Sequence, residues 1–163
     1  MIGSVAVDQL TKRLVVAFLA ERGSVDVIPG VLRFTYVEND GAAFGMLSEH
    51  RWVFMVISTV AIVAMLIYLW KFRPTSLWAC WGISLIIGGG IGNMIDRIYL
   101  DYVIDFIDFC AFPNLWAWVF NVADACVCVG AGILCVWCVT SLISETKAAN
   151  KKKETSSEDQ TPQ

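Results

Sequence analysis

Three long stretches of the sequence carry no charged residue. They comprise residues 52–70, 74–95 and 125–144, and the last extends backwards to about residue 116 across a single Asp. A helix of about 20 apolar residues crosses the roughly 30 Å hydrocarbon core of a bilayer. With 57% hydrophobic and only 17% charged residues among 163, the chain is too apolar for an ordinary soluble domain. We therefore expect an all-α membrane protein.

Residues 1–20 form a fourth, poorer span, because Asp8, Lys12 and Arg13 interrupt it. Asp8 and Lys12 are four residues apart and can pair on one helical face, which lowers the cost of placing both near lipid. The seven residues before Asp8 supply about 10 Å of helix at roughly 1.5 Å per residue. If Asp8 lies near the outer face, they do not reach the inner face, so we expect the natural chain to start earlier.

The basic residues predict the orientation of the spans, because Lys and Arg near span ends are retained in the cytoplasm. The connection after the second span holds Lys71 and Arg73, and the segment after residue 144 holds four Lys residues. Both are expected inside, so four transmembrane helices with both termini in the cytoplasm are predicted. The connections 21–51 and 97–115 then lie outside, in a bacterial cytoplasmic (inner) membrane protein with an outward-facing site.

The outer connection 23–49 has short β-branched runs on either side of Pro29-Gly30, which is a turn signal. We expect a small extracytoplasmic β-sheet there that ends at the polar cluster Glu38 to Gly41. Residues 145–163 are polar, mixed in charge and without apolar periodicity, so they are predicted to form a disordered cytoplasmic tail. The membrane domain then comprises residues 1–144.

Two carboxylates beside the apolar segments are the candidate functional groups. Asp124 stands directly before the uncharged residues 125–144, and Asp105 lies 19 residues earlier in an apolar stretch. A carboxylate at the edge of a membrane segment is costly to keep and marks function by default. Two carboxyl groups a few ångströms apart hold one shared proton near neutral pH, so one can take a proton from water while the other polarises a carbonyl. The alternative is a structural pair capped by backbone amides.

Amide side chains accompany both acidic helices. Asn121 lies three residues before Asp124, and the three-and-four rule places Gly89, Asn93, Asp96 and Arg97 on one helical face. An amide beside a carboxylate is suited to orienting an acid. Arg97 has two readings, an anchor for lipid phosphate or a partner of Asp96. The pair Gly88 and Gly92 favours close helix packing.

Other reactive residues carry less information. His50 has no second ligand nearby, so no metal site is expected. The CxxC spacing of Cys135 and Cys138 falls deep in the last span, where redox or zinc chemistry lacks solvent and further ligands. No disulfide is predicted. Asp101 and Asp108 are assigned to a solvated outer face.

Five segments of the chain, in order, resemble the signatures of bacterial lipoprotein signal peptidase, the signal peptidase II family of aspartic peptidases. They are Asp8-Gln-Leu-Thr-Lys12, Glu38-Asn-Asp-Gly-Ala-Ala-Phe44, Gly92-Asn-Met-Ile-Asp-Arg97, Val103-Ile-Asp-Phe-Ile-Asp-Phe109 and Phe120-Asn-Val-Ala-Asp124. The resemblance implies an endopeptidase without metal or organic cofactor. Such an enzyme removes the signal peptide of a prolipoprotein, cutting just before a cysteine that carries diacylglycerol.

The resemblance also assigns roles to individual residues. It implies that Asp105 and Asp124 are catalytic, and that a further set supports the site or the substrate: Asp8, Lys12, Asn39, Gly89, Asn93, Asp96, Arg97, Asn121 and Ala123. The expected partners are diacylglyceryl prolipoproteins and membrane lipid, with no nucleic acid, and a monomer is sufficient. The alternatives from other classes are a proton or cation carrier and a non-catalytic membrane scaffold. A carrier usually places its acids near the midplane and shows repeat symmetry.

Overall fold

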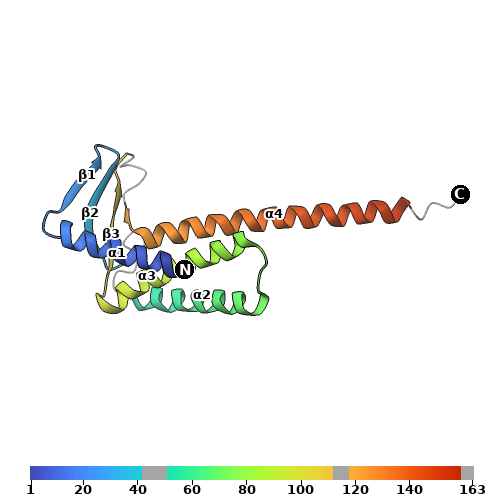
Figure 1. Ribbon diagram of the computed structural model, residues 1–163, viewed down its shortest axis with the longest axis horizontal. Coiled ribbons are helices and arrows are strands. Elements are labelled where there is room, and N and C mark those ends of the chain that lie inside the picture. The colour runs from blue at the N-terminus through green and yellow to red at the C-terminus, as the bar shows by residue number, and fades with distance from the viewer. Residues whose placement is uncertain (42–50, 112–117, 159–163) are drawn as a thin grey trace.

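Residues 1–41, 51–111 and 118–158 are described in the structure, a computed structural model. Within these ranges the chain forms four helices and four strands (Figure 1). In chain order they are α1 (Ile2–Leu19), β1 (Ser24–Ile28), β2 (Leu32–Asn39), α2 (Arg51–Phe72), α3 (Leu77–Tyr99), β3 (Val103–Phe109), β4 (Val119–Phe120) and α4 (Val122–Glu158). The segment 42–44 of the second signature and His50 lie outside the described residues.

Three of the helices are long and apolar enough to cross a membrane. The qualifying segments are Trp52–Phe72 in α2, Leu77–Tyr99 in α3 and Val122–Asn150 in α4. They confirm the three predicted uncharged spans, although α3 begins and ends a few residues later than predicted. The helix α1 forms as expected but does not qualify, since its three charged residues interrupt the apolar run. That α1 also crosses the bilayer stays a prediction.

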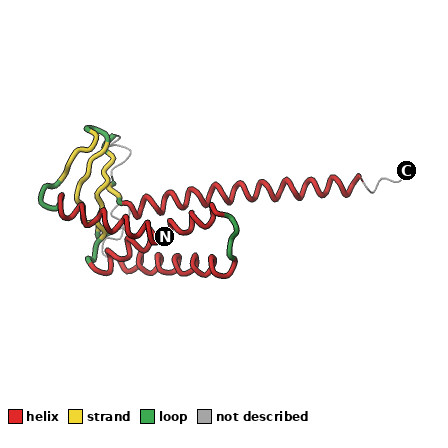
Figure 2. Tube along the Cα trace, viewed as in Figure 1, coloured by secondary structure: helices red, strands yellow, loops and turns green. Residues whose placement is uncertain are grey.

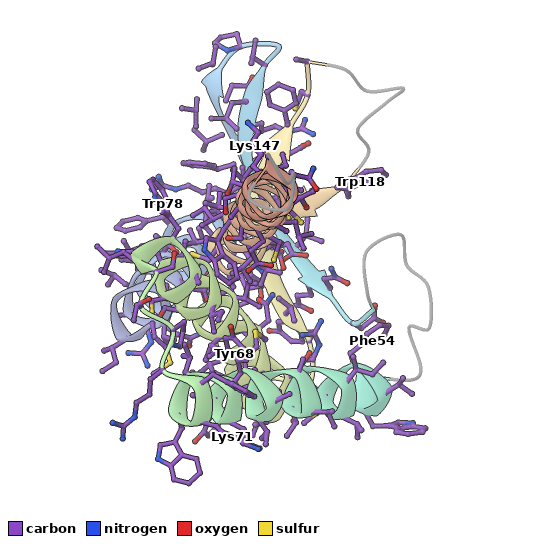
Figure 3. The ribbon with its side chains drawn as sticks, turned by 90° about the vertical axis from the view of Figure 1, so that its right-hand side faces the viewer. Phe54, Tyr68, Lys71, Trp78, Trp118 and Lys147 are labelled. Carbon is purple, nitrogen blue, oxygen red and sulfur yellow. The ribbon has the colours of Figure 1, made fainter. Side chains whose placement is uncertain are left out.

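The helix α2 exposes apolar side chains around its circumference. Trp52 is 60% exposed, Val60 63% and Trp70 76%. A helix that is apolar on all sides is stable only where its surroundings are apolar. In the view along α4, α2 lies apart from α4, and the labelled side chains Tyr68 and Lys71 mark α2 (Figure 3). The helix α2 packs against α3. Lipid is therefore the expected environment of most of α2.

Glycines let α3 pack closely against both α1 and α4. A Cβ at Gly88 would lie 1.9 Å from Ser4 Oγ, and one at Gly92 would lie 2.5 Å from Asp8 Oδ2. A Cβ at Gly89 would lie 2.3 Å from the Ala123 carbonyl oxygen. The predicted close packing at Gly88 and Gly92 is confirmed, and its partner is α1.

The four strands form one antiparallel sheet in the order β1-β2-β3-β4. The turn between β1 and β2 contains Gly30 with a φ of +72°, which a glycine adopts without strain. The predicted sheet in the connection 23–49 is therefore confirmed for β1 and β2. The strands β3 and β4 were not predicted from the sequence, because Val103–Phe109 lacks the alternation of apolar and polar residues that marks a strand with one exposed face.

The helix α4 differs from prediction at both ends. We expected the span to begin at about residue 116, but β4 occupies Val119–Phe120 and the helix starts at Val122. We also expected disorder from residue 145, whereas α4 continues to Glu158. No Gly or Pro stands between Gly132 and Pro162 to stop the helix, and Ala and Lys follow residue 145. The prediction of disorder is wrong for residues 145–158.

The sheet stands at one end of the helices, where the chain packs its small core (Figure 2). Val15 and Leu19 of α1 pack with Ile104 and Phe106 of β3 in one buried cluster. Phe34 of β2 contacts Phe106 edge to face, with ring centroids 5.9 Å apart. This cluster fixes β3 against the end of α1, so the polar residues of β3 have a defined position relative to the helices.

The glycine contacts predict a contrast between two substitutions. Gly89→Ala would force its Cβ against the backbone of α4 and should lower the free energy of unfolding by about 1–3 kcal/mol. Gly132→Ala meets no atom within 4 Å and should raise it by up to about 1 kcal/mol, because Ala favours the helix. Unfolding of both variants in detergent micelles measures the difference. Equal stabilities would contradict the close packing of α3 and α4.

Candidate active site

All eleven residues predicted for the site lie at the end of the helices that carries the sheet. They come from α1, β2, α3, β3 and the first turn of α4, and contacts connect them into one cluster. Most of the polar members are buried: Asp8, Lys12, Asn93, Asp96, Asp105 and Asn121 are each at most 9% exposed. Buried polar groups need partners, and every one of these side chains has them.

The start of α4 places Asp124. Asn121 precedes the helix and Asp124 is its third residue, so the two form a reciprocal capping pair. The Asp124 N–H donates to Asn121 Oδ1 at 3.0 Å, and the Asn121 N–H donates to Asp124 Oδ2 at 3.2 Å. The predicted amide next to this carboxylate is therefore present, and helix capping explains the three-residue spacing.

Asp105 is enclosed by two amide donors. It lies in β3 and is 2% exposed. Asn39 Nδ2 donates to Asp105 Oδ2 at 2.7 Å, and Asn121 Nδ2 donates to Oδ1 at 2.6 Å. Burial raises the pKa of Asp105 to about 6, against the lowering effect of these hydrogen bonds, and the nearby charge of Asp124 raises it further. This carboxyl group therefore gains or loses its proton near neutral pH.

Two asparagine side chains connect the two carboxyl groups. Asn93 Nδ2 donates to Asp124 Oδ1 at 2.7 Å, and Asn121 Nδ2 donates to Asn93 Oδ1 at 3.0 Å. Since Asn121 also donates to Asp105, one chain of amides runs from Asp124 to Asp105. Asp124 itself is half-buried, so one side of the pair is accessible. The amides thus hold the two carboxyl groups near enough for their charges to interact.

The buried ammonium group of Lys12 contacts this chain of amides at Asn93. Lys12 Nζ lies 2.9 Å from Asp8 Oδ2, 2.8 Å from Asp96 Oδ2 and 2.9 Å from Asn93 Oδ1. The predicted pairing of Asp8 with Lys12 is present, and Asp96 is a second acidic partner of Lys12. Arg97 donates to the backbone oxygen of Asn93 at 3.5 Å, and its charge interacts with those of Asp96, Asp105 and Asp124.

The two acids beside Lys12 also bind backbone groups of neighbouring elements. Asp8 Oδ1 accepts from the Ala123 N–H of α4 at 2.9 Å, which satisfies a free donor in the first helical turn. Asp96 Oδ2 accepts from the Ile104 N–H of β3 at 3.2 Å. Ala123 and Gly89 thus belong to the site through their backbones and their small size.

One residue of the cluster was missed from the sequence. Gln9 Nε2 donates to Asp96 Oδ1 at 2.8 Å and to the Gly92 carbonyl oxygen at 3.2 Å. Its spacing of three residues from Lys12 was the available signal. Asp108, assigned to the outer face, pairs with Arg33 across β2 and β3. In the described ranges, no three His, Cys, Asp or Glu side chains are arranged to hold a metal ion.

Comparison with known proteins identifies the family. The model of the family Signal peptidase (SPase) II matches residues 1–140. A lipoprotein signal peptidase of Caldanaerobacter subterraneus subsp. tengcongensis is 46% identical over 130 residues, which is 80% of this chain and 86% of that protein. The lipoprotein signal peptidase of Clostridioides difficile (strain 630) is 41% identical over 133 residues, 82% of this chain and 87% of the relative.

A solved structure supports the same conclusion. A bacterial membrane enzyme determined by the in meso method at 2.3 Å resolution superimposes with a TM-score of 0.75 at 31% identity, covering 89% of this chain and 85% of the other. Because the family model spans most of the chain and close relatives match along it, this chain belongs to the signal peptidase II family.

Proposed function

We propose that this chain is an intramembrane aspartic endopeptidase with Asp105 and Asp124 as its catalytic pair. Its substrates are prolipoproteins that carry diacylglycerol, and it cuts just before the lipidated cysteine. The observation that carries this proposal is the chain of amides linking the two carboxyl groups at the edge of the helices. The relatives are lipoprotein signal peptidases, which supports the choice of substrate.

The geometry suits hydrolysis by a shared proton. The ionised carboxylate takes a proton from water as the water oxygen attacks the scissile carbonyl carbon, and the protonated carboxyl donates to the carbonyl oxygen. The C–N bond then breaks, and the departing nitrogen receives a proton from the pair. Because burial raises the pKa of Asp105 to about 6, this carboxyl group keeps its proton to a higher pH than an exposed Asp does.

The asparagines hold both carboxyl groups in place for this reaction. Asn39 and Asn121 fix the two oxygens of Asp105, and Asn93 fixes one oxygen of Asp124. In a buried setting such hydrogen bonds are stronger than in water. The carboxyl planes are therefore fixed before the substrate arrives, which removes an ordering cost from the reaction.

The proposed orientation in a bacterial cytoplasmic membrane has both termini inside, α1 as a fourth crossing and the site near the outer face. Its support is the distribution of basic residues. Lys71 and Arg73 lie at the connection between α2 and α3, at the end opposite the sheet (Figure 1). Lys147 lies on the distal part of α4, on that same side of the molecule. Retention of basic residues in the cytoplasm favours an orientation with the sheet and the catalytic pair outside.

The sheet and the lipid of the substrate both contribute to binding in this proposal. A substrate helix must unwind to expose its peptide bond, and an edge strand pairs readily with an extended backbone. The diacylglyceryl chains anchor the substrate in the membrane beside the site, at ~0.8 kcal/mol per buried CH₂. One chain supplies the whole site, so a monomer is sufficient.

A cleavage assay tests the catalytic pair directly. Purified protein is incubated with a diacylglyceryl-modified prolipoprotein, and Asp105→Asn and Asp124→Asn are compared with the wild type. Each substitution removes one of the groups that exchange the proton, so each should lower turnover by roughly 10²–10⁴-fold while the protein remains folded.

Asp108→Asn is the matched control for this assay. Asp108 lies on the same strand as Asp105, but its carboxylate pairs with Arg33 on β2. This variant should retain wild-type turnover. Normal turnover in either Asp105→Asn or Asp124→Asn would exclude the proposed pair.

The electrostatic coupling of the pair predicts a pKa change. The negative charge of Asp124 raises the pKa of Asp105, so Asp124→Asn should lower the pKa of Asp105 below about 6. Asp105 would then release its proton at a lower pH than in the wild type. A ¹³C NMR titration of labelled carboxyl groups in micelles measures the shift. An unchanged Asp105 titration would show that the two groups do not interact.

A further inference from the structure

The Lys12 side chain has a complete and unusual set of partners. It is 1% exposed, and its Nζ lies within 2.9 Å of one oxygen each from Asp8, Asp96 and Asn93. An ammonium group has three hydrogens and no lone pair, so three acceptors satisfy it fully. Two of these acceptors are carboxylates, and the third is the neutral amide that holds Asp124.

This geometry fixes which atoms of Asn93 face which neighbours. Because Lys12 only donates, the atom of Asn93 that faces it must be the carbonyl oxygen. Asn121 Nδ2 also donates to that oxygen, at 3.0 Å. The amide nitrogen of Asn93 is thereby directed to Asp124 Oδ1, 2.7 Å away. In the reverse orientation, the nitrogen would face two donors and the oxygen would face a carboxylate.

We infer that Lys12 is a positioning residue for the catalytic pair: its ammonium orients Asn93 so that Asp124 receives an N–H donor. The inference rests on the function proposed above. It gives Lys12 a role in the reaction beyond holding the helices together, although Lys12 touches neither the water nor the scissile bond.

Within the described residues, the cluster holds five charged side chains besides Lys12. These are Asp8 on α1, Asp96 and Arg97 on α3, Asp105 on β3 and Asp124 on α4. Lys12 and Arg97 balance Asp8 and Asp96, which leaves the catalytic pair with its own single negative charge. Burial raises the pKa of Asp105, and the charge of Lys12 lowers it. Loss of Lys12 should therefore let the pair keep its proton to a higher pH.

The test uses a variant that removes Lys12 without leaving Asp8 unpaired. In Lys12→Met/Asp8→Asn, the net charge of α1 is unchanged, and an Asn at position 8 still offers an oxygen to the Ala123 N–H. In the prolipoprotein cleavage assay, we expect kcat to fall roughly 100-fold, the loss typical of a small misplacement of a reacting group, with KM unchanged. In the single variant Lys12→Met, which removes the positive charge without compensation, we also expect the alkaline limb of the pH profile to move to higher pH.

Arg13→Met is the matched control, because it removes a cation from the neighbouring position of α1, where the side chain is exposed. It should retain the kcat and the pH profile of the wild type. A folded Lys12→Met/Asp8→Asn protein with wild-type kcat would overturn the inference. A purely structural role of Lys12 would lower the melting temperature and leave both kinetic readouts unchanged in the folded fraction.

Asn93→Asp is the second variant, and it keeps the inference testable if the double variant does not fold. An Asp at position 93 still accepts from Lys12, so the fold should hold, but it presents an oxygen to Asp124 in place of an N–H. Turnover should fall by a similar factor and recover partly at lower pH, where the new carboxyl is protonated. Normal turnover at neutral pH would overturn the inference. Failure of the proposed function is distinguishable, because Asp105→Asn and Asp124→Asn would then cleave normally.

Discussion

The rest of the site depends on the contacts of the buried Lys12 ammonium group with its three acceptors. A charge removed from water is tolerated only when it is paired and fully hydrogen-bonded. Lys12 meets this condition with acceptors from α1 and α3. The same two carboxylates then bind the Ala123 N–H of α4 and the Ile104 N–H of β3. One cation thus ties together three helices and the strand that carries Asp105.

Close helix packing makes this cluster possible. In a membrane, the hydrophobic effect does not drive one helix against another, and small residues let backbones approach instead. Gly89 and Gly92 bring α3 within contact distance of Ala123 and Asp8, so short side chains can reach backbone donors at the start of α4. Two free N–H groups of that first turn are satisfied by Asp8 and Asn121, which allows the helix to begin beside the carboxylate of Asp124.

The two carboxyl groups lie on different elements, Asp105 in β3 and Asp124 in the first turn of α4. Asp105 is enclosed in the sheet, and Asp124 lies at a helix start, where one side stays accessible. Burial on one side and access on the other give the two chemically identical groups different environments, which is the requirement for one to be an acid while the other is a base.

Local patterns in the sequence predicted the apolar spans, the first two strands, the three-residue spacing of Asn121 and Asp124, and the pairing of Asp8 with Lys12. These features depend on local periodicity and on the length of uncharged runs. Only the resemblance to a family selected Asp105 from the nearby acids, and only the tertiary structure showed how Asn39, Asn93 and Gln9 contact acids on other elements. It also revealed β3, β4 and the continuation of α4 to Glu158. Contacts between residues more than 60 positions apart depend on how the helices and strands pack. No local pattern in the chain therefore predicts that Asn93 is the third acceptor of Lys12.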